Sequence, residues 1–564
     1  MMRNVNTTVP PTINATMESL TKGSPAKRFF YASAILLCFV ALIGCMTVRD
    51  YGMTWDEPFR FGGGDQKLGY YQALFVGGEL PNMQGDSYPG LFDLPLAIMQ
   101  EALPEWGTRS EKGHVYSLCF GLLGMLAMWR TAARIGGERA GFIALVLLAT
   151  VPRYYGHMFF NPKDIPLAGT YALGVWTVVA LLSRLPWPAW RYVVAIGLAA
   201  GVALSARIAG FLVLCYFGLF IFLFLAAKHG VAVARGNPFG VRELFVDLGV
   251  WTFRGVVAGL VALGVLLVFW PTLHMNPFTS AGNALETVQS YGWGGRVLMD
   301  GYFWEAMDLP IYYIPYWLIF TLPESVQLLF VTAIVFGLLR FVAYARAGVW
   351  PPAAVVLSRL VPVFATLFPL AYLLYADPTL YDGMRHYLFI LPPMACVCAL
   401  ALEWLIRWAH RSGKRYLSFA LPFGVGVAVL FVVADMVALH PYQYVYFNRT
   451  SGGLPAAYMR DETDYWGLSH QEAAEWLNQY VEAIDPAGGR VFKVHQRYTR
   501  WMLQEALDPN RFEMWQSREG ADFFVSITRF NLHSSYPEAE LLHIVERQGV
   551  PLCFIYSFNS KASK

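Results

Sequence analysis

Two adjacent carboxylates, Asp56 and Glu57, come directly after the first apolar stretch of the chain, between Trp55 and Pro58. A carboxylate next to the hydrocarbon layer of a membrane is costly to desolvate, and such residues are often functional. The same two acids could instead end a helix and face water. The pair alone therefore permits two interpretations, and the rest of the chain must decide between them.

Two further clusters of polar residues lie between apolar stretches. One is the turn 157–166, which contains Lys163 and Asp164, and the other is the segment 377–387, which contains Arg385. Lys163 and Asp164 could be an interfacial ion pair, and Arg385 could anchor a helix end by extending its charge to the membrane surface. Because all three clusters are expected on one face of the membrane, a shared site is the favoured interpretation.

The residue types in these clusters fit group transfer from a lipid-linked phosphate. The guanidinium of Arg385 can bind a phosphate through two parallel hydrogen bonds. A carboxylate can take the proton of an attacking hydroxyl. Since phosphate leaves as an anion, the reaction needs charge stabilisation but no general acid.

The elements that hold these clusters are predicted to be membrane-spanning helices. Of the 564 residues, 56% are hydrophobic and only 14% are charged, and the mean hydropathy is +0.41. A soluble chain of this length would need more polar surface, so a polytopic α-helical membrane protein is predicted. Membrane lipids are its expected surroundings, and the net charge of +3 gives no indication of nucleic acid as a partner.

Eleven apolar stretches approach the length of roughly 20 residues that spans a bilayer. They begin near residues 29, 114, 140, 164, 192, 208, 248, 316, 354, 385 and 416. Lys and Arg residues collect in alternate connections, which predicts a cytoplasmic N-terminus. The connections 49–113, 271–315 and 376–384, and everything after about residue 440, are then external.

Three regions follow from this topology: a disordered cytoplasmic tail (1–28), a transmembrane domain (29–440) and an extracytoplasmic α/β domain (441–564). In the last region, Ser469-His470-Gln471-Glu472 has the pattern of a capping box. Residues 491–495, 521–530 and 551–558 have the composition of strands. This region shows no nucleotide-binding glycine loop and no nucleophile cluster, so we interpret it as a docking or acceptor-contact domain.

The motifs, in this order, resemble those of the GT-C glycosyltransferases, and most of all the bacterial branch related to protein O-mannosyltransferases and the lipid A aminoarabinose transferase. The resemblance rests on Asp56-Glu57, on Asn161-Pro162-Lys163-Asp164-Ile165-Pro166-Leu167-Ala168 and on Arg385-His386. It is supported by two aromatic segments, 309–316 and 440–448, and by Asp464-Tyr465-Trp466-Gly467. It extends from about residue 30 to about residue 560.

The resemblance implies a GT-C fold, a polyprenyl-phosphate-linked sugar donor and an inverting transfer. The acceptor would be a lipid, a glycan or a protein at the periplasmic face of the bacterial inner membrane. Matched by position, Asp56 is expected to be the catalytic base, Glu57 its supporting neighbour and Asp164 the second acidic residue.

The same matching assigns residues to the donor. Arg385 is expected to bind the phosphate, with His386 and Lys163 as helpers. Tyr312 and Tyr313 are expected near the donor phosphate or sugar. Some relatives hold a divalent metal at the second acidic position, but Lys163 next to Asp164 can supply the same positive charge, so no cofactor is assigned and metal use stays open.

Two other functions are compatible with a polytopic chain. A transporter or flippase of lipid-linked sugars should carry ionisable residues inside its spans and inverted repeats, whereas the charges noted here gather at external ends, with Arg207 as the exception. A non-catalytic scaffold would not require Asp56 and its cationic counterparts. The enzyme is therefore the favoured interpretation.

Overall fold

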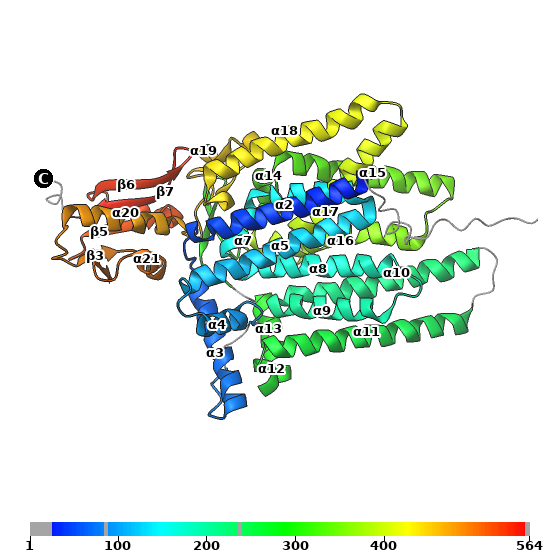
Figure 1. The fold of residues 1–564 in the computed structure, drawn as a ribbon, viewed down its shortest axis with the longest axis horizontal. Coiled ribbons are helices and arrows are strands. Elements are labelled where there is room, and N and C mark those ends of the chain that lie inside the picture. Colours follow the sequence, from blue (N-terminus) through cyan, green and yellow to red (C-terminus); the bar gives the residue numbers. More distant parts are fainter. Residues whose placement is uncertain (1–24, 84–87, 235–239, 291, 559–564) are drawn as a thin grey trace, which may run out of the picture.

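The computed structural model describes residues 25–83, 88–234, 240–290 and 292–558. Long helices run side by side, and a small sheet caps one end of them, close to α3 and α4 (Figure 1). Most of the predicted disordered tail, residues 1–24, lies outside the described residues. The prediction is wrong for residues 25–28, because helix α2 already begins at Pro25.

Nine helices of the described part are long and apolar enough to cross a membrane. They are α2 (Pro25–Thr47), α5 (Arg109–Gly136), α8 (Asp164–Leu182), α10 (Leu212–Ala234), α11 (Val241–Phe269), α15 (Glu324–Ala347), α16 (Ala353–Ala376), α17 (Leu391–Arg411) and α18 (Arg415–Leu439). The chain is therefore a polytopic helical membrane protein, as predicted.

The count of eleven spans is not reproduced, although a helix lies at or near each predicted start. Helices α6 (Glu138–Ala149) and α7 (Pro152–Phe160) are bent by 69° and together form at most a tenth span. The break occurs at Pro152, which lacks the N–H that would continue α6. Helix α9 (Trp190–Ala206) has only 17 residues.

The apolar stretch that begins near residue 316 is divided into two helices. Helix α14 (Tyr313–Thr321) ends just before Pro323, and α15 begins directly after it. Proline favours an extended residue before it and so ends helices. The predicted span is therefore displaced to α15, and α14 is a separate short helix before it.

The two long connections that were predicted to be external are mostly structured. The first contains η1 (Val48–Asp50), α3 (Glu57–Val76) and α4 (Asp93–Ala102). The second contains α12 (Thr272–Met275), α13 (Pro277–Ser290) and an antiparallel hairpin of β1 (Arg296–Met299) and β2 (Tyr302–Glu305). Helices α3 and α4 pack closely at Gly64, where a Cβ atom would lie 2.5 Å from the Asp93 carbonyl oxygen.

The C-terminal region forms a five-stranded sheet in the order β4-β3-β5-β7-β6. Its strands are β3 (Phe492–His495), β4 (Phe512–Trp515), β5 (Phe523–Ile527), β6 (Glu540–Arg547) and β7 (Val550–Ser557), accompanied by helices α20 (Ser469–Ile484) and α21 (Arg500–Ala506). Strand β3 pairs in parallel with β4 and β5, whereas β7 pairs antiparallel with β5 and β6. An α/β arrangement was predicted for this region, without β4 and β6.

Two local predictions in this region are wrong. Leu468 and not Ser469 is the N-cap of α20, and no capping box forms, because the Ser469 hydroxyl donates to the Asp464 carboxylate instead. The predicted strand 521–530 ends at Ile527, since the chain turns into the short 3-10 helix η6 (Arg529–Ser534).

Candidate active site

Asp56 is buried in the turn before α3, and two cations contact its carboxylate. Lys163 Nζ donates to Oδ1 at 3.0 Å, and Arg385 Nη2 donates to Oδ2 at 3.3 Å. The structure thus brings together one residue from each of the three predicted clusters. Burial by itself would raise the pKa of Asp56, but the charges of Lys163 and Arg385 outweigh it and hold this pKa below its usual value of 3.8.

Glu57, the first residue of α3, faces away from these cations. Its Oε2 accepts hydrogen bonds from the Thr54 amide at 2.6 Å and the Thr54 hydroxyl at 2.9 Å. Its Oε1 lies 3.2 Å from Nε2 of His114 on α5. Glu57 therefore closes the turn that presents Asp56 and ties that turn to α5.

Asp164 is the first residue of α8 and lies in the same charge cluster. Its Oδ1 is 2.8 Å from Arg207 Nη2, and its Oδ2 accepts from Asn161 Nδ2 at 2.9 Å and lies 3.9 Å from Arg385 Nε. Asn161 Oδ1 also accepts from the amides of Lys163 and Asp164, at 3.1 and 2.8 Å. The Asn161 side chain thus shapes the turn that places both charges beside Asp56.

Arg385 lies at the start of the 3-10 helix η3 (Arg385–Ile390), which leads into α17. Its guanidinium carbon lies 4.7 Å from the ring centre of Trp466, 4.8 Å from that of Tyr381 and 5.5 Å from that of Trp55. Aromatic faces attract a cation and exclude water from it. Arg385 is therefore fixed in a dry environment in which charge interactions are strong.

The three remaining predicted donor residues differ in their surroundings. His386 packs edge-on against Tyr381, with ring centres 4.6 Å apart, and its buried Nδ1 has no hydrogen-bond partner. The Tyr313 hydroxyl donates to the Gly383 carbonyl at 2.9 Å. Tyr312, in contrast, is 43% exposed and presents its ring at the external end of α14.

Sequence reasoning did not assign Asp382 and Arg529 to the site. Asp382 Oδ2 accepts from Arg385 Nη1 at 3.0 Å, and Asp382 Oδ1 accepts from Arg529 Nη2 at 2.7 Å. All three side chains are buried. Arg529 is the first residue of η6, so the C-terminal region contributes a charge to the cluster around Asp56.

A further ion cluster lies on α3 and α4. Arg60 Nε donates to Asp93 Oδ1 at 2.8 Å, and Lys67 Nζ donates to Asp93 Oδ2 at 3.2 Å. The Tyr88 ring lies near both Arg60, at 4.9 Å, and Lys163, at 5.5 Å. Tyr88 thus connects this cluster to the surroundings of Asp56.

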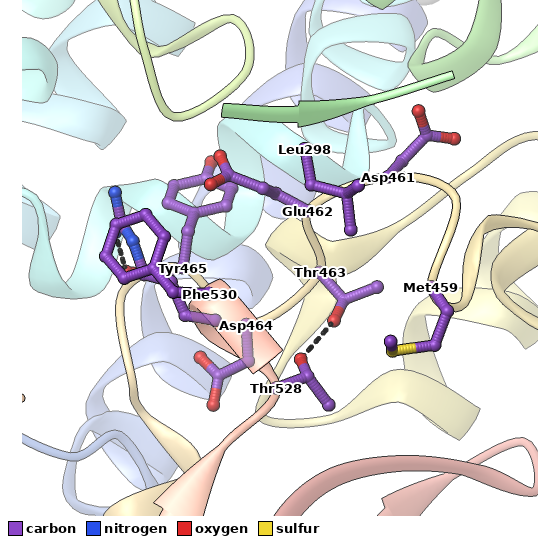
Figure 2. Close-up of a pocket in the computed structure, with 10 residues that line it drawn as sticks. Leu298, Met459, Asp461, Glu462, Thr463, Asp464, Tyr465, Thr528 and Phe530 are labelled. Carbon is purple, nitrogen blue, oxygen red and sulfur yellow. Dashed lines mark hydrogen bonds between the residues drawn. The ribbon is translucent and has the colours of Figure 1, made fainter. Parts of the chain in front are cut away.

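A small pocket beside the site contains another buried acid, Glu462. Figure 2 shows its carboxylate above the Thr463–Thr528 pair, whose hydroxyls are 3.4 Å apart. Glu462 Oε2 has no hydrogen-bond partner among the residues that the structure describes. Burial raises the pKa of Glu462 to about 8, although nearby Arg529 opposes this rise.

The acids around Asp56 are paired with cations of the protein itself. Asp56 and Asp164 are already paired with the cations Lys163, Arg207 and Arg385. Hard cations such as Mg²⁺ need several oxygen ligands, and the part of the chain that the structure describes contains no group of three or more His, Cys, Asp or Glu arranged to hold a metal.

Solved structures of three other proteins match this chain at low sequence identity. The Archaeoglobus fulgidus oligosaccharyltransferase with a tethered acceptor peptide has 12% identity and a TM-score of 0.47, over 90% of this chain and 70% of its own. ArnT from Cupriavidus metallidurans bound to undecaprenyl phosphate has 14% identity and a TM-score of 0.43, over 94% and 99%. The S. cerevisiae protein O-mannosyltransferase Pmt1-Pmt2 complex bound to the sugar donor has 18% identity and a TM-score of 0.32, over 47% and 36%.

At the level of sequence, the comparison with curated proteins gives no match. Residues 106–238 match the model of the family described as dolichyl-phosphate-mannose-protein mannosyltransferase. This segment includes α5, the turn 157–166 and Arg207. The resemblance to protein O-mannosyltransferases that the motifs indicated is thereby confirmed over this part of the chain.

Proposed function

We propose that this protein is an inverting GT-C glycosyltransferase. It moves a sugar from a polyprenyl-phosphate carrier to a hydroxyl of a lipid, glycan or protein at the periplasmic face of a bacterial inner membrane. The observation that carries the proposal is the buried, ionised carboxylate of Asp56, held between Lys163 and Arg385. The family match over residues 106–238 supports a donor linked to a lipid phosphate.

In the proposed reaction, Asp56 accepts the proton of the acceptor hydroxyl as its oxygen attacks the anomeric carbon. The bond between that carbon and the phosphate oxygen breaks, and its electron pair leaves with the phosphate. A single displacement from the opposite side inverts the anomeric centre. The leaving phosphate gains negative charge, which nearby fixed cations stabilise.

Under this proposal, Lys163 and Arg385 pair with Asp56 before the donor binds. When the donor is bound, they also face its phosphate, and His386 lies beside them. The exposed ring of Tyr312 supplies an apolar face for a sugar. Tyr313, whose hydroxyl bonds to Gly383, holds the loop that carries Asp382.

We also propose that the two regions of the chain have different roles. Residues 29–440 form the catalytic domain, and residues 441–564 form a periplasmic domain that contacts the acceptor. The N-terminus is cytoplasmic in this proposal.

Sugar release from radiolabelled polyprenyl-phosphate sugars by the purified protein in detergent, with envelope extract as the acceptor source, tests the proposal. The wild type should turn over one donor. Asp56→Asn should lose activity by a factor of about 100 or more, since a general base contributes about 10²–10⁴.

Asp65→Asn is the matched control, because Asp65 also lies on α3 but pairs with Arg109 at the surface. It should keep the activity of the wild type. Robust turnover by a folded Asp56→Asn variant contradicts the assignment of Asp56 as the catalytic base. If the wild type turns over no donor, transport or a scaffold role becomes the better explanation.

A further inference from the structure

The C-terminal region contributes a buried charge, Arg529, to a site whose other charged residues come from the helical part of the chain. Arg529, Asp382, Arg385 and Asp56 form a continuous line of alternating charges, with successive N–O distances of 2.7, 3.0 and 3.3 Å. The exposure of each side chain is 3% or less. In such a dry environment each charge depends on its neighbours for compensation.

The backbone around Arg529 is held in an uncommon conformation. Phe530 and Asn531 have φ angles of 55° and 57°, a region that non-glycine residues rarely adopt, and the rarity is greatest for bulky ones. Such strain persists only where the surrounding structure demands it, and it is concentrated at functional sites. The turn is thus built to direct the Arg529 side chain toward the bundle.

Other contacts fix the orientation of the Arg529 guanidinium. Nη1 donates to the Tyr465 carbonyl at 2.7 Å while Nη2 donates to Asp382. The Trp55 ring, next to Asp56 in the chain, lies 6.0 Å from Arg529 and 5.5 Å from Arg385. Arg529 is therefore coupled to the candidate base through both Asp382 and Trp55.

We infer that Arg529 is a positioning residue of the proposed glycosyl transfer. It compensates the charge of Asp382, so that Arg385 remains available to Asp56 and to the donor phosphate. Without Arg529, Asp382 has only Arg385 as a cationic partner within salt-bridge distance, and the guanidinium is drawn away from Asp56. The inference rests on the proposed function for its catalytic consequence, but the coupling itself is a property of the folded protein.

The catalytic consequence is tested by the dependence of turnover on pH in the full chain. Turnover requires ionised Asp56 and so falls as pH falls through its pKa. In Arg529→Gln, Arg385 is drawn toward Asp382 and stabilises the ionised form of Asp56 less. The decline of turnover at low pH, the acid limb of the profile, should therefore move to higher pH by about one unit. The added change Asp382→Asn removes the competing acid and should move the limb back toward that of the wild type.

Arg518→Gln is the matched control, because Arg518 belongs to the same region but pairs with Glu538 at the surface, half-exposed. Its acid limb should equal that of the wild type. If Arg529→Gln loses activity by one constant factor at every pH, Arg529 is merely structural and the inference is wrong. If the wild type is inactive with every donor, the proposed function is wrong. The thermal unfolding measurement below then still tests the coupling between Arg529 and Asp56.

Thermal unfolding of four proteins measures that coupling without catalysis: the wild type, Asp56→Asn, Arg529→Gln and the double variant. The two side chains share no direct contact within hydrogen-bond or ion-pair distance, so independent positions would give additive shifts in Tm. We expect the double variant to lose less than the sum, because removing Arg529 leaves an excess of negative charge that Asp56→Asn relieves. Additive shifts overturn the inference. Arg529→Met, which also removes the charge, replaces Arg529→Gln if the latter does not fold.

Discussion

Asp56 and Glu462 are both buried acids, 2% and 6% exposed, yet they differ in proton affinity. Two cations contact Asp56, and its pKa stays below 3.8. Glu462 has no salt bridge within 4 Å in the described structure, one of its oxygens is unpartnered, and its pKa rises to about 8. Burial acts on both in the same direction, so the position of the neighbouring cations makes the difference.

This difference separates two roles for a carboxyl group at neutral pH. An ionised carboxylate can accept a proton, as the proposed base must. A carboxyl group that keeps its proton can donate a hydrogen bond, but it cannot act as that base. Arg529 is paired with Asp382, and its charge favours the ionised form of Glu462 without outweighing burial.

Among substitutions of the cations around Asp56, the largest effect is expected from Arg385→Gln, which removes the cation that Asp56, Asp164 and Asp382 share. Turnover should fall by a factor of about 10²–10³, as when a group that stabilises transition-state charge is lost. Thermal stability should fall as well, because three buried acids lose their common partner.

The affinity for the donor distinguishes the role of Arg385 from that of Asp56. A polyprenyl phosphate should bind more weakly to Arg385→Gln than to the wild type, measured by equilibrium binding, whereas Asp56→Asn should keep its affinity. Equal affinity of Arg385→Gln and the wild type would limit Arg385 to charge that develops in the transition state.

A smaller effect is expected from Lys163→Met, which leaves Arg385 in contact with Asp56. Loss of the Lys163 charge should raise the pKa of Asp56, so turnover should decline with falling pH at values about one unit above those of the wild type. The measurement is the pH profile of turnover at saturating donor. An unchanged acid limb would show that Asp56 does not titrate in the rate-limiting step.

The sequence identified Asp56, Lys163, Asp164 and Arg385 because each interrupts or borders an apolar stretch, where a charge is conspicuous. The spans were predicted for the same reason, since hydropathy is a local property. The angle of the bend at Pro152 and the length of α9 depend on how helices pack, which hydropathy does not describe.

Other features carry no local signal. Arg529 follows an ordinary strand and is 147 residues from Asp382, so only the folded chain reveals their pairing. Ser469 has the spacing of a capping residue, but it lies inside the first turn of α20, where its amide and its hydroxyl both donate to the Asp464 carboxylate. Strand β6 forms an edge of the sheet, and its mixed polar sequence hides the strand pattern.

The smallest change in turnover is expected from Glu462→Gln, because an amide has the shape of the protonated acid that the wild type holds at pH 7. Its effect should appear in stability instead. The folded pKa of about 8 exceeds the ordinary value of 4.5, so the folded state binds more protons than the unfolded state between these values. The stability of the wild type therefore falls as pH rises through this window.

The Gln variant does not have this dependence, so its Tm should rise relative to that of the wild type from pH 5 to pH 8 and then level off. Glu513→Gln, on the exposed side of β4, serves as the control and should show a difference that does not vary with pH. If the Glu462→Gln difference is also constant, Glu462 is ionised in the folded protein. Both acids would then carry charge, and they would differ only in their direct contacts, since Asp56 alone would be paired with cations.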